Sequence, residues 1–284
     1  MKLSIVIAVF NEARTVGELL ESVLAQPLPH ITKEIVIVES NSTDGSREIV
    51  ADFAARHAGN ATVEISVIYQ REPKGKGDAI RAGLAVATGD VILIQDADLE
   101  YDVADYPELL KPILDDRTAF VLGSRHMGAD NWKIRKFGGT GLRAVFMNCG
   151  GILFHGFFNF LFRTRLTDPT TMYKVFRAEC LEGLSFSCNR FDFDFELLGK
   201  LIRAGFEPIE VPVSYTSRGF EDGKKIRVFR DPLTWIVAIA KCRFAKLDAQ
   251  PSNMSRRTAR AESIAPSLPR TATRFRFSQR DYNE

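Results

Sequence analysis

Three carboxylates stand close together in the segment Asp96-Ala97-Asp98-Leu99-Glu100. The segment follows the apolar run 91–94, whose β-branched residues are typical of a buried strand. In an open α/β sheet, ligands bind beyond the carboxyl ends of the strands, so we expect these side chains at a binding edge. Neighbouring carboxylates repel each other unless a cation lies between them, and Mg²⁺ or Mn²⁺ takes oxygen ligands together with substrate phosphates. The segment therefore predicts a metal that holds a diphosphate, with a solvated acidic loop as the alternative.

Further polar side chains follow the other predicted strands. Asn11 and Glu12 come after the first strand, and Glu39 and Ser40 come after the second. Because the loops after parallel strands converge at one edge of the sheet, these residues are expected near the acidic segment. Glu12 and Glu39 are candidate acceptors for hydrogen bonds from a base and from ribose hydroxyls.

Lys76 lies in a glycine-rich loop ahead of a predicted helix. Gly75 and Gly77 on either side permit close approach of the backbone to a ligand. The start of a helix also attracts anions, so this loop is a candidate phosphate site. The alternative for Lys76 is a loop lysine in water.

Strands and helices must alternate to position these groups, and over the first 125 residues they do. The predicted strands cover 3–9, 34–38, 65–69, 91–94 and 119–122, and the predicted helices cover 15–25, 46–56, 78–87 and 106–114. This alternation predicts an α/β fold with a doubly wound, mostly parallel sheet. Farther along, the pattern predicts helices at 193–203 and from Asp231-Pro232 onward, with an extended segment at 208–215 between them.

Composition bounds the class of protein. The 284 residues are 45% apolar and carry a net charge of +2, which allows a large core and gives no indication of a nucleic-acid partner. The four cysteines show neither the spacing of a zinc site nor that of a disulfide framework, so reduced thiols in the cytoplasm are expected. The basic tail 247–284 has few large apolar residues and is expected to be disordered.

The uncharged apolar stretch 144–162 approaches the length of a membrane span. Asn148, His155 and Asn159 nevertheless share one helical face within it. Arginines flank the stretch at Arg143, Arg163 and Arg165. An apolar helix with a polar stripe, near 142–162, is expected to lie in the plane of a membrane surface. A core or dimer contact and a true span are the alternatives.

Taken in chain order, the motifs resemble those of glycosyltransferase family 2, in the branch of dolichyl-phosphate mannose synthase and its bacterial polyprenyl-phosphate relatives. The matching segments are Ser4–Glu12, Ile37–Ser46, Gly75–Ala79, Gln95–Asp102, Gly123–Arg125, Thr167-Asp168, Tyr173–Arg177, Arg190–Glu196, Glu210–Tyr215, Arg218 and Gly223–Ile226. The resemblance covers residues 3–246 and implies one GT-A domain over 1–246. It would have a nucleotide-binding half at 1–125, an acceptor half at 126–246 and interfacial helices toward its C-terminal end.

The resemblance also implies an activity and a set of site residues. The activity is an inverting, metal-dependent transfer from a nucleotide-diphosphate sugar, of the GDP-mannose or UDP-glucose type, to a polyprenyl or dolichyl phosphate. The enzyme would be cytoplasmic and peripheral on the cytoplasmic face of the membrane. The implied metal ligands for Mg²⁺ or Mn²⁺ are Asp96, Asp98 and Glu100. The implied catalytic set is Asp98, Arg218, Lys224 and Asp194. The implied donor-binding set is Phe10, Asn11, Glu12, Glu39, Lys76, Asp96, Arg125 and Lys225.

Alternatives remain at several of these positions. A phosphate acceptor is already a nucleophile at neutral pH, whereas a glycan or lipid hydroxyl would require a carboxylate base, with Asp194 or Asp192 as the candidates. Their alternative role is a pair of acidic residues at a helix start. Glu39-Ser40 stands where the family usually has Asp-Asp, which leaves the nucleotide preference open, and Asp168 before Pro169 is equally compatible with a turn. A non-catalytic protein that binds nucleotide sugars is the remaining alternative.

Overall fold

The computed structural model of the chain describes residues 1–60, 62–127, 154–217 and 231–244. The described strands are β1 (Lys2–Val9), β2 (Thr32–Glu39), β3 (Val63–Tyr69), β4 (Val91–Asp96), β5 (Phe120–Ser124), β6 (Lys174–Arg177) and β7 (Ile209–Pro212). The helices are α1 (Val16–Ala25), α2 (Ser46–Arg56), α3 (Lys76–Val86), α4 (Tyr106–Leu114), α6 (Phe193–Arg203) and α7 (Asp231–Phe244), with a further helical segment at 154–162. Short 3₁₀ turns occur at Val103–Asp105 and Ala178–Leu181.

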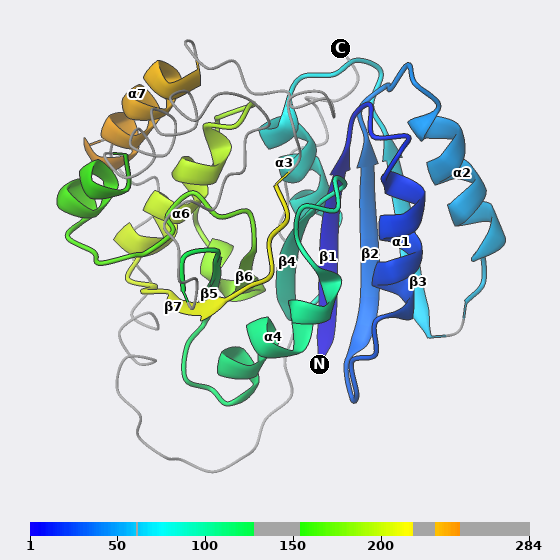
Figure 1. The fold of residues 1–284 in the computed structure, drawn as a ribbon, viewed down its shortest axis with the longest axis horizontal. Coiled ribbons are helices and arrows are strands. Elements are labelled where there is room, and N and C mark those ends of the chain that lie inside the picture. The colour runs from blue at the N-terminus through cyan, green and yellow to red at the C-terminus, as the bar shows by residue number, and fades with distance from the viewer. Residues whose placement is uncertain (61, 128–153, 218–230, 245–284) are drawn as a thin grey trace.

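The strands of the described residues form one seven-stranded sheet in the order β3-β2-β1-β4-β6-β5-β7 (Figure 1). The pairs β3-β2, β2-β1, β1-β4 and β5-β7 are parallel. β6 runs antiparallel to both of its neighbours, β4 and β5. The prediction of an α/β fold with a mostly parallel sheet is therefore confirmed.

Alternate residues of each strand face opposite sides of the sheet, and each side has its own core. On one side, Leu3, Ile5 and Ile7 of β1 pack in a cluster with residues of α1 and α4. On the other side, Val6 of the same strand belongs to a cluster with residues of α3, α6, α7 and the 154–162 helix. The sheet is thus covered on both faces, as the apolar strand sequences require.

Two differences from the sequence prediction bear on the site. β6 was not predicted, because four residues are too few to show a strand pattern. α3 begins at Lys76 rather than at residue 78, so Lys76 lies in the first helical turn instead of a loop.

The predicted interfacial helix is described only over 154–162, and residues 142–153 lie outside the described part of the chain. Within the described residues, no helix has both the length and the apolar character that a bilayer crossing needs.

Candidate functional site

A pocket of about 510 Å³ lies at the edge of the sheet where β1, β2, β4 and β5 end. Because β6 is antiparallel, its first residues reach the same edge. Eight of the predicted site residues line this pocket: Phe10, Glu12, Lys76, Asp96, Asp98, Glu100, Arg125 and Asp194. Segments far apart in the sequence thus meet in one place. Arg218, Lys224 and Lys225 lie outside the described residues.

Asn11 and Glu39 do not line the pocket but support the loops around it. The Asn11 Oδ1 atom accepts a hydrogen bond from the backbone N–H of Thr43 at 2.8 Å. The fully buried Glu39 accepts one from the backbone N–H of Ser42 at 2.6 Å, and its other oxygen lies 3.5 Å from Nε of Arg47. Both side chains therefore hold the loop after β2 in the structure.

The loop after β2 in turn holds the loop after β1. The backbone N–H of Glu12 donates to Oγ of Ser46 at 2.8 Å, and that of Ala13 donates to Asp44 at 3.0 Å. Burial opposes ionisation of Asp44, but the hydrogen bonds from Ser46 and Ala13 outweigh it and lower the pKa of this carboxyl. The network fixes the backbone of Glu12 at the pocket wall.

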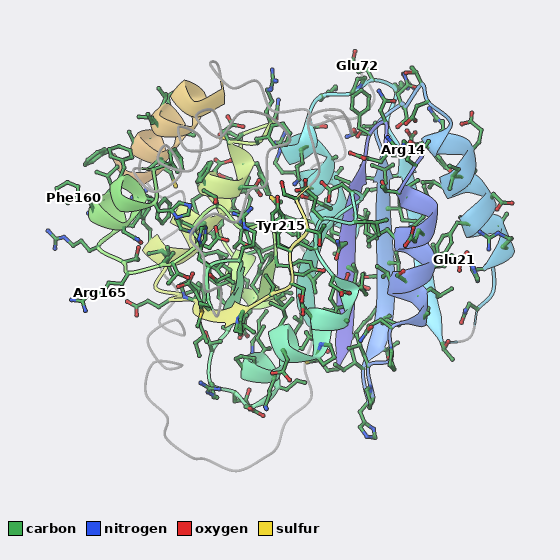
Figure 2. All side chains as sticks on the ribbon, viewed as in Figure 1. Arg14, Glu21, Glu72, Phe160, Arg165 and Tyr215 are labelled. Carbon is green, nitrogen blue, oxygen red and sulfur yellow. The ribbon has the colours of Figure 1, made fainter. Side chains whose placement is uncertain are left out.

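The acidic segment forms a tight turn directly after β4. Leu99 has a φ of 57°, an uncommon conformation for a residue other than glycine, and Asp98 Oδ1 accepts the backbone N–H of Glu100 at 3.1 Å. The Tyr215 hydroxyl donates to Glu100 at 2.8 Å, and Tyr215 lies near the middle of the molecule in Figure 2. The turn brings the predicted metal ligands to one pocket wall, and carboxylate oxygens are a donor set that fits Mg²⁺ or Mn²⁺.

Lys76 supplies positive charge next to this turn. Its ammonium group forms an ion pair with Asp96 and lies 3.2 Å from the sulfur of Met172. Burial lowers the pKa of Lys76, but Asp96 and Asp194 more than compensate and raise the pKa above its ordinary value. Lys76 therefore carries a positive charge at neutral pH and lines the pocket.

The start of α3 is fixed by close packing against the loop before α6. Gly75 has a φ of 112°, and a Cβ atom there would collide with the carbonyl oxygen of Asn189. The same carbonyl accepts the backbone N–H of Asp78 at 3.1 Å. The glycine-rich sequence thus permits a contact that positions Lys76.

Lys174 forms an ion pair with Asp194, which lines the pocket, and the sequence reasoning gave this lysine no role. It is the first residue of β6, its side chain is fully buried, and its ammonium group donates to the carbonyl oxygen of Thr171. Its Nζ atom lies 3.7 Å from Oδ1 of Asp194. Burial lowers the pKa of Lys174, while the Asp194 carboxylate acts in the opposite direction. A lysine within an otherwise apolar stretch was the available signal.

Arg125 is held rigidly by Asp168. Nε and Nη2 of Arg125 donate to the two carboxylate oxygens at 2.6 and 2.7 Å. Although burial favours the neutral acid, the guanidinium group holds the pKa of Asp168 well below its usual range. Arg125 also stacks on Tyr215, with 5.1 Å between the guanidinium carbon and the ring centroid. The structure therefore gives Asp168 the role of anchoring a pocket-lining arginine.

Comparison with solved structures agrees with this architecture. The crystal structure of glucosyl-3-phosphoglycerate synthase from Mycobacterium tuberculosis in complex with Mn²⁺, UDP and phosphoglyceric acid superposes with a TM-score of 0.62 at 16% identity, over 86% of this chain and 78% of that chain. Mannosyl-3-phosphoglycerate synthase from Rubrobacter xylanophilus gives 0.58 at 20% identity, over 95% and 79%. At these identities the likeness establishes the GT-A fold alone.

Sequence relatives include dolichyl-phosphate glucosyltransferases and a dolichol-phosphate mannosyltransferase. A dolichyl-phosphate beta-glucosyltransferase from Trichomonas vaginalis is 29% identical over 75% of this chain and 64% of its own length. The Drosophila melanogaster dolichyl-phosphate beta-glucosyltransferase is 29% identical over 81% and 70%, and the Pyrococcus furiosus dolichol-phosphate mannosyltransferase is 27% identical over 79% and 59%. The chain thus spans less than two-thirds of the first and the last of these relatives.

The family model described as glycosyl transferase family 2 matches residues 4–182. That range includes the acidic turn, Lys76, Arg125 and Lys174, and it ends before α6 and Asp194. The chain belongs to glycosyl transferase family 2.

Proposed function

We propose that the protein transfers a sugar from a nucleotide-diphosphate sugar to a polyprenyl phosphate, with inversion at the anomeric carbon. The observation that carries this proposal is the pocket of complementary charge: carboxylates Asp96, Asp98 and Glu100 lie on one wall, with Lys76 and Arg125 lining the same cavity. Such a pocket suits a diphosphate bound with a divalent cation. The dolichyl-phosphate sugar transferases among the relatives support the acceptor class.

The proposed reaction needs stabilisation of a leaving nucleoside diphosphate. Asp98, with Asp96 and Glu100, would hold Mg²⁺ or Mn²⁺, which when bound would neutralise charge on the diphosphate. Lys76 and Arg125 contribute fixed positive charge in the same pocket. The family resemblance adds Arg218, Lys224 and Lys225 to the groups that contact the phosphates. Phe10 and Glu12, which line the pocket after β1, would contact the base and ribose.

The proposed acceptor is already ionised, so the enzyme would require no general base. A phosphate oxygen would attack the anomeric carbon from the face opposite the leaving diphosphate, and the bond between that carbon and the diphosphate oxygen would break. Asp194 lines the pocket at 6% exposure, and Nζ of Lys174 lies 3.7 Å from its Oδ1 atom. This position suits an acceptor for hydroxyl groups of the donor sugar.

The same position of Asp194 favours a second candidate function. If the acceptor were a glycan or lipid hydroxyl, Asp194 would serve as the general base. The two candidates differ in what happens when this carboxylate is removed.

The proposed site of action is a membrane surface. Phe160 is 80% exposed on the 154–162 helix and Phe244 is 75% exposed on α7. The two helices contact each other, since Nε of Arg243 donates to the carbonyl oxygen of Leu161 at 2.8 Å. In Figure 2, Phe160 and Arg165 both point outward at one edge of the molecule. Exposed aromatic and basic side chains are typical of peripheral membrane contact. We further propose that the protein acts on the cytoplasmic face of the membrane. The free thiols of Cys180, Cys188 and Cys242 support this, because free thiols are typical of a reducing compartment.

One assay tests donor and acceptor together. Purified protein is incubated with Mn²⁺, a panel of radiolabelled nucleotide sugars, and undecaprenyl or dolichyl phosphate, and the chloroform-soluble label is counted. We expect label in the organic phase with one donor, and none without the lipid phosphate. Transfer to a glycan or lipid hydroxyl but not to the phosphate would support the second candidate. Binding of nucleotide without any transfer would overturn both.

A further inference from the structure

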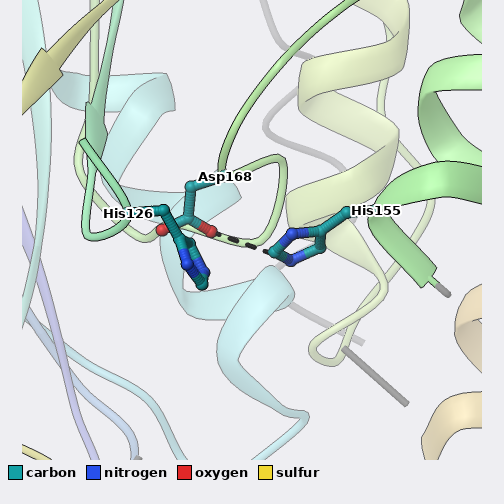
Figure 3. A group of neighbouring side chains, drawn as sticks. All are labelled: His126, His155 and Asp168. Carbon is teal, nitrogen blue, oxygen red and sulfur yellow. Dashed lines mark ion pairs between the residues drawn. The ribbon is translucent and has the colours of Figure 1, made fainter. Parts of the chain in front are cut away.

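Two histidines and an aspartate lie close together (Figure 3), near the end of β5 and the pocket-lining Arg125. His126 directly follows Arg125, His155 lies at the start of the described 154–162 helix, and Asp168 lies in the loop before β6. One ring nitrogen from each histidine and one carboxylate oxygen lie within 4.8 Å of one another. The two imidazole rings are nearly perpendicular, at 87°, with centroids 5.3 Å apart. The reaction proposed above makes no use of these histidines.

The hydrogen bonds of Asp168 argue against a metal ion in this cluster. A carboxylate has about four lone-pair positions. One oxygen of Asp168 accepts the backbone N–H and the Nε of Arg125, at 3.1 and 2.6 Å. The other accepts Nη2 of Arg125 at 2.7 Å and the hydroxyl of Thr170 at 2.9 Å. A metal ion would have to displace the guanidinium group from a buried carboxylate, so Asp168 is the counter-ion of Arg125.

Thr170 fixes the direction of its contact with His155. Its single hydroxyl proton goes to Asp168, because an ionised carboxylate only accepts. Its oxygen then accepts from Nη2 of Arg125 at 2.7 Å and from Nε2 of His155 at 3.2 Å. The network therefore assigns a proton to Nε2 of His155. The Asp168 oxygen 4.0 Å away would stabilise this imidazole in its charged form.

Protonation of either imidazole would add positive charge beside Arg125. Asp168, the carboxylate of the cluster, is already paired with Arg125. Arg125 and Thr170 line the pocket, which connects the cluster to the site of reaction.

The 154–162 helix also connects the cluster to the exposed face described above. Phe160 follows His155 by five residues, which places the two side chains about 140° apart around a helix of 3.6 residues per turn. His155 faces Asp168, whereas Phe160 is 80% exposed. One helix thus presents an apolar side chain outward and an imidazole inward.

We propose that His126 and His155, together with Arg125, bind a phosphomonoester group, which in the reaction is the head group of the lipid acceptor. The proposal rests on the proposed function for the identity of that acceptor. The binding chemistry itself, two imidazoles and a guanidinium group on a phosphate dianion, is independent of turnover. Protonated imidazoles donate charge-assisted hydrogen bonds to phosphate oxygens, and a bound dianion in turn favours their protonation.

Histidine NMR tests this directly, because the chain has four histidines: His30, His57, His126 and His155. Protein labelled with ¹³C-histidine is titrated with inorganic phosphate, geranyl phosphate or UDP, and resonances are assigned from His→Gln variants. We expect geranyl phosphate to shift His126 and His155 toward the protonated form, with inorganic phosphate doing so more weakly. UDP should leave both resonances unchanged. No probe should shift His57, which follows α2 on the opposite face of the sheet from the 154–162 helix.

The dissociation constants of two variants make the test quantitative. His155→Gln should raise the dissociation constant for geranyl phosphate about tenfold, the effect of losing one charge-assisted hydrogen bond, without changing that for UDP. His57→Gln is the matched control and should change neither. Shifts of His126 and His155 with UDP would assign the cluster to the donor, and a stoichiometric Zn²⁺ complex lost in His155→Gln would make it a metal site. Either result, or no response to geranyl phosphate, would overturn the proposal. Phosphate binding at the histidines without any chloroform-soluble product would instead count against the proposed function alone.

Discussion

Substitution of a single residue in the acidic turn can test which carboxylate binds the metal. Asp98 is half-buried on the pocket wall and is the expected principal metal ligand. Asp98→Ala should abolish Mn²⁺ binding and transfer, while the free energy of unfolding falls by only about 1 kcal/mol, because the backbone N–H of Glu100 loses its acceptor. Mn²⁺ electron paramagnetic resonance and thermal melts check the two effects. Asp102→Asn, an exposed carboxylate of the same loop that does not line the pocket, is the control and should bind Mn²⁺ normally. Normal Mn²⁺ binding by Asp98→Ala would contradict the proposed metal site.

Asp194 discriminates between the two candidate acceptors. A general base contributes about 10²–10⁴-fold to a rate. For a phosphate acceptor, Asp194→Asn should keep most of the maximal rate and raise KM for the sugar donor, because one hydroxyl acceptor is weakened. The measurement is kcat and KM with a polyprenyl phosphate. A loss of kcat beyond about a hundredfold at unchanged KM would identify a base and favour a hydroxyl acceptor.

At the scale of single residues, the sequence predicted much of the pocket lining but little of the network that holds the lining residues in place. Clustered carboxylates, a lysine between glycines and an arginine after a strand have recognisable chemistry, and they line the pocket. Lys174 and Asp168 gave weak signals, because their meaning depends on partners, Asp194 and Arg125, that only the tertiary structure brings near. Glu39 was predicted from its strand position, which does not reveal that its side chain folds back on Ser42.

Among the elements, the start of α3 depends on close approach at Gly75. Gly75→Ala adds a Cβ both at positive φ and against the Asn189 backbone. Gly59→Ala is a matched control, because Gly59 also has a positive φ, of 78°, but has nothing within 4 Å of the added atom. Each should lose about 1 kcal/mol from the backbone conformation, and Gly75→Ala about 1–3 kcal/mol more from overpacking, together with weaker nucleotide binding. Urea unfolding of both variants measures the difference, and equal losses would contradict the close contact.

The link between β5 and the loop before β6 depends on pH. Because the folded-state pKa of Asp168 is lowered, its pair with Arg125 stabilises the protein fully above the unfolded-state pKa, about 3.9, and loses this contribution as pH falls below it. Asp168→Asn should cost about 3–5 kcal/mol at pH 7, because it leaves a buried guanidinium group unpaired. The difference in unfolding free energy between the two proteins should shrink below about pH 4. Urea unfolding across pH 3–7 checks this, and a pH-independent difference would exclude the ionised pair as its cause.

Helices could be predicted from the sequence where the helical repeat of apolar residues extends over several turns. The helices at 46–56, 106–114 and 193–203 begin and end as predicted. The strand order was not predictable, because β6 is short and its place between β4 and β5 is decided by pairing across the sheet rather than by its own sequence.

For the whole molecule, the exposed aromatic side chains define a membrane test. Phe160→Ser combined with Phe244→Ser should reduce co-sedimentation with anionic liposomes several-fold, because each change removes apolar area that would enter the interface. Leu114→Ser is the control, since Leu114 is 49% exposed at the end of α4, on the opposite face of the sheet from the 154–162 helix. A double variant that still sediments like the unchanged protein would rule out this face as the membrane contact.

The position of β6 also has a consequence for synthesis. β4 and β5 have no direct pairing and are joined only through β6, which the ribosome makes after both of them. Until residue 177 has emerged, the nascent chain carries unpaired edges on both strands, a situation that favours aggregation. Lys174 and Met172 arrive with the same segment. A chain interrupted before this point would therefore lack a continuous sheet and part of the pocket at once.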